Sequence, residues 1–157
     1  MDDLYTELIT EHSRSTEHRK HLENPTSIEH GHNPSCGDDI TLEVKIENGI
    51  IAEASFNGVG CAISQASTDM MIDLMEGKSV EEARRLIDLF IRMIKSELND
   101  DDDIEELDEA ATLENISNLP ARVKCAVLAW RTLDRAIIGS AANDENRSPT
   151  MGQASRL

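Results

Sequence analysis

The sequence is poor in features that would point to several common functions. Lys and Arg number 15 against 31 Asp and Glu, which gives a formal net charge of −16, and aromatic residues make up 3% of the 157 residues. Nucleic-acid binding needs clustered basic residues to hold phosphates, so this charge argues against it and equally against an anionic membrane surface. No apolar run reaches the roughly 20 residues that span a bilayer.

Cysteine is also scarce, with only Cys36, Cys61 and Cys125 present. The first residues include Asp2 and Asp3, where a secretory signal would carry basic and then apolar residues, so we expect a cytoplasmic protein. In that compartment an odd number of cysteines favours metal or thiol chemistry over a disulfide framework. With so few aromatic residues, the core must be built from Leu, Ile, Val, Ala and Met.

Hydrophobic patterning predicts an α+β fold around a small antiparallel sheet. Residues 40–46 and 50–56 alternate apolar and polar side chains, as half-buried strands do. Asn48-Gly49 lies between them and is typical of a tight hairpin, because it accepts a positive φ. A short third strand is expected around residues 59–63.

Helical periodicity predicts about five helices packed against this sheet. Their expected spans are 2–21, 64–75, 79–98, 104–111 and 121–138. Residues 24–34 are polar with two prolines and are predicted to be a loop, and the acidic run 99–103 is predicted to be exposed and mobile. We expect one domain over 1–138 and a disordered C-terminal tail over 139–157.

Cys36 has surroundings unlike those of a buried core cysteine. It lies between a Pro-Ser pair and Gly37, with no apolar run around it, which favours a metal ligand or a reactive thiol over an inert surface cysteine. Asp38 could point to the same centre across the flexible glycine. It could equally be a turn or strand-entry residue, and Asp39 could serve in its place.

Cys61 and Cys125 are ambiguous when each is taken alone. The glycines of Gly58-Val-Gly60 before Cys61 would let the backbone approach a metal or would mark a bulge, and the apolar neighbours also fit a core position. Cys125 is expected near the start of the last helix, where the helix dipole stabilises a thiolate, although by itself it fits an apolar core residue better. Together with Asp38, three thiolates would form a tetrahedral set that zinc accepts.

The five histidines are weaker ligand candidates. His30 and His32 lie near the first cysteine and could bind a metal, but we interpret them as surface-loop residues. His12, His18 and His21 are predicted to be solvated on the first helix.

Three motifs in this order resemble the SufU branch of the IscU/NifU-type iron–sulfur cluster assembly proteins. They are Asn33-Pro-Ser-Cys-Gly-Asp38, Gly58-Val-Gly-Cys-Ala-Ile-Ser64 and Ala121-Arg-Val-Lys-Cys-Ala-Val-Leu-Ala-Trp130. The resemblance covers about residues 4–138 and implies a SufE/NifU-like fold. IscU scaffolds carry a histidine immediately before the third cysteine, where this chain has Lys124. The interval between the second and third cysteines is also longer here, and both departures resemble SufU.

The resemblance implies a zinc-bound sulfur acceptor. Such a protein takes persulfide sulfur from a SufS-type, pyridoxal-phosphate cysteine desulfurase and passes it towards a SufBCD-type scaffold. The implied Zn²⁺ ligands are Cys36, Asp38, Cys61 and Cys125. Cys36 is the implied persulfide acceptor, with Cys125 as the runner-up. Arg122 would help to dock the partner or steer the persulfide, unless it is simply an exposed helix charge.

Two other functions stay open at the level of sequence. A scaffold for a transient [2Fe–2S] cluster or for iron would use the same Cys and Asp ligands. A binding module without turnover would use zinc only as a source of folding free energy.

Overall fold

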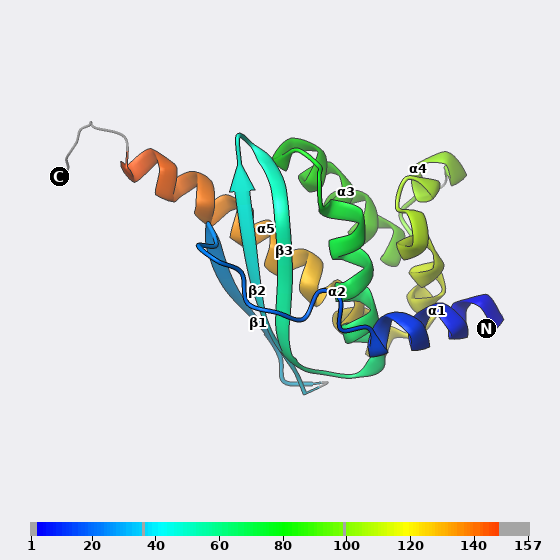
Figure 1. Ribbon diagram of the computed structural model, residues 1–157. Coiled ribbons are helices and arrows are strands. Elements are labelled where there is room, and N and C mark those ends of the chain that lie inside the picture. Colours follow the sequence, from blue (N-terminus) through cyan, green and yellow to red (C-terminus); the bar gives the residue numbers. More distant parts are fainter. Residues whose placement is uncertain (1–2, 36, 99, 148–157) are drawn as a thin grey trace.

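The computed structural model describes residues 3–35, 37–98 and 100–147 (Figure 1). Its strands are β1 (Ser27–Asn33), β2 (Asp38–Glu47) and β3 (Ile50–Val59). They form one antiparallel sheet in the order β1-β2-β3. The helices are α1 (Asp3–Arg14), α2 (Ala62–Met75), α3 (Val80–Ile94), α4 (Asp101–Glu105), the 3-10 helix η1 (Asp108–Asn118) and α5 (Pro120–Arg147). The predicted α+β fold with a three-stranded antiparallel sheet is confirmed.

The hairpin between β2 and β3 lies where the sequence predicts it. Asn48 and Gly49 have φ values of 55° and 75°, and the two strands pair in antiparallel register on either side of them. Positive φ at both central residues is the geometry of a type I′ turn, whose twist matches that of the strands. The Asn-Gly turn sets the pairing of Glu47 with Ile50, and a register shift between Lys45 and Ile46 then brings Asp39, at the start of β2, opposite Val59 at the end of β3.

The first strand, β1, occupies most of the segment 24–34, which was predicted to be a loop. That prediction was wrong because β1 shows almost no apolar alternation. Its one large apolar residue, Ile28, is 62% exposed, and its inward side at Gly31 is buried without a large side chain. An edge strand of this composition carries no hydrophobic signature, since its stability comes from pairing with β2.

Two other boundaries also differ from the prediction. The expected third strand over 59–63 does not form, because β3 ends at Val59 and α2 begins at Ala62. Helix α1 ends at Arg14 rather than near residue 21. Beyond it, His18 turns inward: its carbonyl accepts a hydrogen bond from the Phe56 backbone N–H, and its ring lies against Asp73. His12 and His18 are buried, so the prediction that they are solvated was wrong.

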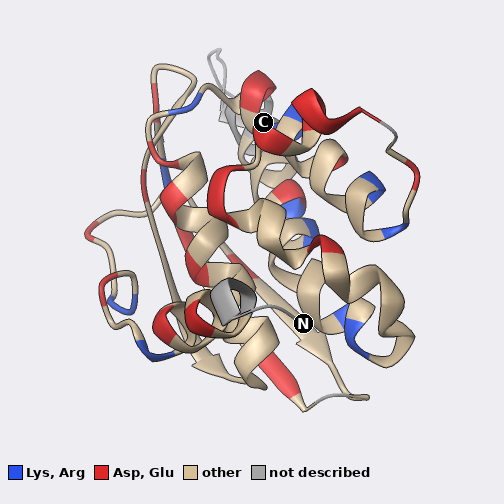
Figure 2. Ribbon diagram, turned by 90° about the vertical axis from the view of Figure 1, so that its right-hand side faces the viewer, with Lys and Arg blue, Asp and Glu red and all other residues tan. Residues whose placement is uncertain are grey.

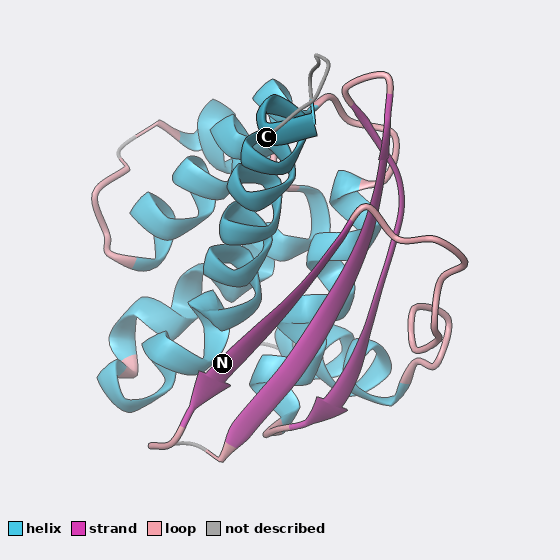
Figure 3. Ribbon diagram, turned by 90° about the vertical axis from the view of Figure 1, so that its left-hand side faces the viewer, coloured by secondary structure: helices cyan, strands magenta, loops and turns pink. Residues whose placement is uncertain are grey.

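The helices cover one face of the sheet (Figures 1 and 3). Helix α5 packs on β1 and β2, while α2 packs against α1, α5 and β3. Phe90 of α3 stacks on Trp130 of α5 at a ring distance of 3.9 Å, inside a core otherwise built largely of aliphatic residues and methionines. Two of the four aromatic residues of the sequence thus pack together where α3 and α5 meet.

The C-terminal part is more helical than expected. Helix α5 continues to Arg147, although the domain was predicted to end at residue 138 and a disordered tail to follow. Residues 148–157 lie outside the described part, so their disorder stays a prediction. The acidic run is helical over Asp101–Glu105 as α4, and η1 replaces the single helix expected over 104–111. Among the described residues, no helix has the length and apolar character needed to cross a membrane.

Candidate metal centre

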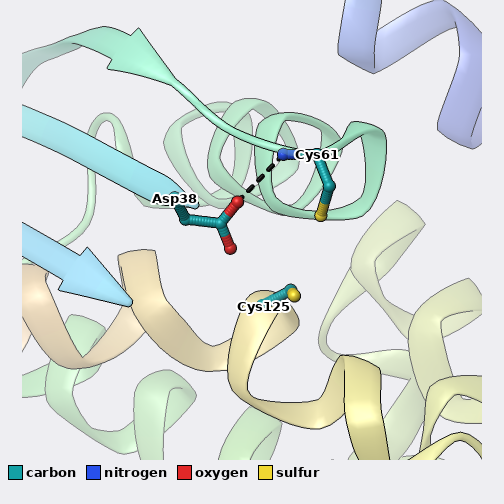
Figure 4. A group of neighbouring side chains, drawn as sticks. All are labelled: Asp38, Cys61 and Cys125. Carbon is teal, nitrogen blue, oxygen red and sulfur yellow. Dashed lines mark hydrogen bonds between the residues drawn. The ribbon is translucent and has the colours of Figure 1, made fainter. Parts of the chain in front are cut away.

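Three of the four predicted ligands come together from separate elements (Figure 4). Asp38 begins β2, Cys61 immediately precedes α2, and Cys125 lies in the second turn of α5. One ligand atom from each, the two sulfurs and a carboxylate oxygen, lie within 4.8 Å of one another. The fourth predicted ligand, Cys36, lies outside the described residues, so the full set of four ligands stays a prediction.

Cys61 is the N-cap residue of α2. Its φ and ψ of −71° and 166° are extended, and its Sγ accepts a hydrogen bond from the Ser64 backbone N–H at 3.4 Å. The sulfur therefore lies at the positive end of the helix dipole, which stabilises a thiolate. Sequence reasoning assigned this advantage to Cys125, which instead lies past the first turn of α5 and is 1% exposed.

Asp38 is fully buried, and one of its two carboxylate oxygens has a hydrogen-bond partner among the described residues. Its Oδ1 accepts a hydrogen bond from the Cys61 backbone N–H at 2.9 Å (Figure 4). Its Oδ2 is buried and has no hydrogen-bond partner among the described residues. Because an unpaired carboxylate oxygen in the interior costs free energy, a cation beside it would remove a penalty. Two cysteine sulfurs and this oxygen are the ligand atom types that zinc accepts.

Asp39, the alternative to Asp38, is excluded by its orientation. It is about half exposed, and its Oδ1 lies 2.5 Å from Nε2 of His30 on the neighbouring strand. His30 and His32 are exposed, as predicted, although they lie on β1 rather than in a loop. Alternation along β2 thus turns Asp38 inward and Asp39 outward.

Gly60 makes room for the Asp38 carboxylate. A Cβ at this position would lie 2.7 Å from Asp38 Oδ1 and 3.0 Å from Gln65 Nε2, closer than real side chains approach. The glycine before Cys61 therefore acts by close packing against a side chain, which differs from both roles expected from the sequence, approach to a metal and a bulge. It lets the end of β3 lie directly over the carboxylate.

Sequence reasoning missed the polar side chains that surround this carboxylate. Asn33, Ser64 and Gln65 are all buried, and Asn33 Nδ2, Ser64 Oγ and Gln65 Nε2 lack hydrogen-bond partners among the described residues. The available signal was the pair of polar residues Ser64 and Gln65 in the first turn of the helix that follows Cys61. Such a cluster of buried polar atoms without hydrogen-bond partners is typical of a site that binds an ion, water or another ligand.

A hydrogen-bond relay between α2 and α5 fixes the separation of the two cysteines. Ser67 of α2 donates its hydroxyl proton to the Ala126 carbonyl at 2.6 Å, and its Oγ accepts a hydrogen bond from Trp130 Nε1 at 2.9 Å. All three groups are buried, and Ala126 is the residue after Cys125. The relay therefore holds the Cys125 turn of α5 opposite the start of α2.

Arg122 lies on the first turn of α5 and is exposed. It precedes Cys125 by three residues and therefore lies on the same side of the helix. Lys124, which occupies the position of the IscU histidine, is also exposed. The cations at this end of α5 face solvent, where a partner could reach them.

The comparisons with known proteins agree with this arrangement. A family model described as the NifU-like N-terminal domain matches residues 4–145. The chain belongs to this family. The matched region includes the three described site residues and most of α5, and so extends past the domain boundary predicted at 138.

The similar proteins carry two kinds of name. The chain is 42% identical over 134 residues to the iron–sulfur cluster assembly scaffold protein IscU of Thermotoga maritima, covering 85% of this chain and 92% of the relative. It is 34% identical over 137 residues to the zinc-dependent sulfurtransferase SufU of Bacillus subtilis, covering 87% and 91%. A crystal structure from Fervidobacterium islandicum AW-1, described as a cluster assembly scaffold for the SUF system, superposes with a TM-score of 0.80 at 35% identity, covering 85% and 96%.

Proposed function

We propose that this NifU-like domain is a zinc-dependent sulfur acceptor that takes persulfide sulfur from a SufS-type cysteine desulfurase. The observation that carries the proposal is the buried Oδ2 of Asp38, which has no hydrogen-bond partner among the described residues and lies beside the sulfur atoms of Cys61 and Cys125. The name of the SufU relative supports the same reading. With Cys36 added, these residues supply the three sulfurs and one oxygen that would hold zinc.

Two of the four proposed ligands are anchored by the helices that carry them. Cys61 and Cys125 belong to helices joined through the Ser67 relay, so their sulfurs are held in place. Cys36 belongs to the connection between β1 and β2, next to Gly37 at φ 69°. Zinc, when bound, would keep the thiols deprotonated at neutral pH and protected from oxidation.

Cys36 is the proposed acceptor in this scheme. Its thiolate attacks the outer sulfur of the desulfurase persulfide and forms a new S–S bond. The original S–S bond breaks, and the desulfurase cysteine leaves as a thiolate. Cys125, the alternative acceptor, is 1% exposed, which disfavours direct attack on a sulfur carried by another protein.

Arg122 and the onward transfer complete the proposal. Arg122 is exposed and lies three residues before Cys125 on α5, so its guanidinium could meet the anionic persulfide or an acidic patch of the desulfurase. The sulfur held on Cys36 would then pass to a SufBCD-type scaffold. Both assignments rest on the family resemblance.

The test is the rate of sulfide release by a SufS-type desulfurase with and without this protein, together with zinc content. The zinc-loaded wild-type chain is expected to stimulate turnover, and Cys36→Ala to abolish the stimulation. Asp38→Asn is expected to lose both zinc and stimulation. Asp39→Asn, which removes the adjacent outward-facing carboxylate, is the matched control and is expected to keep both. Full stimulation by Cys36→Ala would disprove the acceptor assignment.

A scaffold for a transient [2Fe–2S] cluster is the second candidate, favoured by the name of the IscU relative. The same residues could bind iron through sulfur and one carboxylate oxygen. An aerobically stable visible cluster spectrum without zinc would favour the scaffold. If chelation alone unfolded the protein and no stimulation occurred, a zinc-stabilised binding module would be favoured instead.

A further inference from the structure

A second group of metal-binding side chains lies farther along α2 and takes no part in the thiol site. His12 of α1 is 6% exposed, and its Nδ1 lies 2.6 Å from Oδ2 of Asp69 on α2. Its other ring nitrogen, Nε2, lies 2.5 Å from Oε1 of Glu109 on η1. Asp69 is eight residues beyond Cys61, so helix rise places the two groups roughly 12 Å apart.

Asp73 adds a second carboxylate from the next turn of α2. Its Oδ2 lies 3.9 Å from His12 Nδ1, and its Oδ1 lies 2.6 Å from His18 Nε2. His18 therefore holds one oxygen and leaves the other facing His12. One ligand atom from each of His12, Asp69 and Asp73 lie within 4.8 Å of one another.

The Asp69 carboxylate is buried with one unsatisfied oxygen. Asp69 is 2% exposed, and its Oδ1 has no hydrogen-bond partner among the described residues although its Oδ2 contacts His12. Burial raises the pKa of Asp69 above its ordinary value, in spite of the neighbouring histidines. The contact with His12 therefore compensates one carboxylate oxygen and leaves the buried Oδ1 without a partner among the described residues, which costs free energy in the interior.

The contacts around this group match those that orient metal ligands. A ligating histidine normally donates its other N–H to a carboxylate, which fixes the tautomer. Glu109 supplies that carboxylate at Nε2. Nδ1 is then the ring nitrogen that would bind the metal, and it lies on the side of Asp69 and Asp73. His18 orients the Asp73 carboxylate in a comparable way.

We propose that His12, Asp69 and Asp73 bind one divalent transition-metal ion, with Glu109 and His18 orienting the ligands. One imidazole and two carboxylates suit Mn²⁺, Fe²⁺ or Zn²⁺, whereas an imidazole is an unfavourable ligand for Ca²⁺ or Mg²⁺. This N/O site would differ from the sulfur-rich site in its metal preference. A metal bound there would bridge α1 and α2, because His12 lies on α1 and the two aspartates lie on α2.

A cavity beside the cluster gives a hydrated cation a route to it. The cavity measures about 660 Å³, and its lining includes Asp73 and Glu109, which both contact His12. Asp108 adds a third carboxylate to the lining. Figure 2 shows acidic segments along the helices on this side of the molecule. The acidic lining would attract a cation before it is dehydrated.

Manganese is the best probe because it prefers nitrogen and oxygen ligands to thiolates. Zinc-loaded, full-length protein would be titrated with Mn²⁺, and the loss of the free-ion electron paramagnetic resonance signal would give the bound equivalents. The wild-type chain is expected to bind one Mn²⁺, and Asp69→Asn none. Glu109→Gln is expected to weaken binding by about tenfold, as losses of orienting partners do. Asp88→Asn, which removes an exposed carboxylate of α3, is the matched control and is expected to keep the bound ion.

Two results would overturn the proposal. One is no Mn²⁺ binding by the wild-type chain at millimolar concentration and pH 8. The other is a full equivalent bound by folded Asp69→Asn. If that variant fails to fold, Glu109→Gln decides, since unchanged affinity there contradicts the assigned geometry. Zinc content and desulfurase stimulation of Asp69→Asn report separately on the sulfur-transfer function and are expected to be unchanged.

Discussion

Two buried aspartate-centred groups, one beside the start of α2 and one on the helix itself, differ in how their charge is compensated. Asp38, beside the start of the helix, accepts a hydrogen bond from a backbone N–H, and the sulfur atoms of Cys61 and Cys125 lie close to it. Asp69, two turns along, faces the ring of His12, which can carry a proton. Both carboxylates keep one buried oxygen without a partner among the described residues.

This difference sets how far each group depends on a metal. At Asp69, a proton on His12 can balance the carboxylate when no ion is bound. The hydrogen bond that Asp38 accepts comes from an uncharged backbone N–H, so a bound cation is expected to balance its carboxylate. We therefore expect the thiol site to lose more stability than the His–Asp cluster when metals are removed.

Metal removal should show the largest effect. Chelation of zinc is expected to lower the free energy of unfolding by about 4 kcal/mol, relative to protein kept in zinc at a thousand times its dissociation constant. Removal of Mn²⁺ from the His–Asp cluster should cost less, because His12 takes up a proton in its place. Denaturant unfolding with each metal present and absent measures both values, and a larger loss on removing Mn²⁺ would reverse the comparison.

Ser67→Ala separates the two groups structurally. It removes the hydroxyl that links the Ala126 carbonyl to Trp130 Nε1, and it leaves buried groups unpaired at an expected cost of about 1–3 kcal/mol. The relay positions α5, which supplies Cys125 but no ligand of the His–Asp cluster. Zinc affinity is therefore expected to fall while Mn²⁺ affinity stays unchanged. Equal weakening at both sites would show that the relay acts on the whole fold.

Gly60→Ala tests the close packing over Asp38. The added Cβ would lie 2.7 Å from Asp38 Oδ1, so the carboxylate must shift, and zinc affinity is expected to fall by at least tenfold. Gly139→Ala is the control, because a Cβ there meets no atom within 4 Å. As a helical glycine, it should gain about 0.5–1 kcal/mol on replacement by alanine. Unchanged zinc affinity in Gly60→Ala would show that this glycine is not needed to position the Asp38 carboxylate.

The smallest expected effect is a pH dependence that belongs to His12 alone. Its folded-state pKa lies above the unfolded value of 6.5, so its stabilising contribution is fully present below pH 6.5. The contribution is lost as pH rises through the raised pKa. In metal-free protein, the wild-type chain should lose more stability than His12→Gln across this window, as measured by denaturant unfolding in a pH series. Parallel curves for the two proteins would contradict the assigned ion pairs.

The sequence predicted the thiol site better than the His–Asp cluster for a physical reason. Asn48-Gly49 and the glycines before Cys61 are local signals, and the structure has a turn and a helix start at these two places. Asp69 sits within a helical run and gives no local sign that it will meet His12, 57 residues earlier. That meeting depends on how α1 packs on α2, which no short motif encodes.

The same reasoning explains the misread segments. Strand β1 forms because β2 offers a pairing edge, although its own residues show little alternation. The inward turn after α1 depends on the edge of β3, where Phe56 donates to the His18 carbonyl. Both are long-range effects that override local preference.

X-ray absorption at the zinc edge tests the central claim most directly. One equivalent of zinc bound to the wild-type chain is expected to show a first shell dominated by sulfur at about 2.3 Å, with one oxygen at about 2.0–2.2 Å. Asp38→Asn should lose that zinc, whereas Asp69→Asn should leave the spectrum unchanged. A shell of nitrogen and oxygen alone, or a spectrum altered by Asp69→Asn but not by Asp38→Asn, would contradict the thiol site.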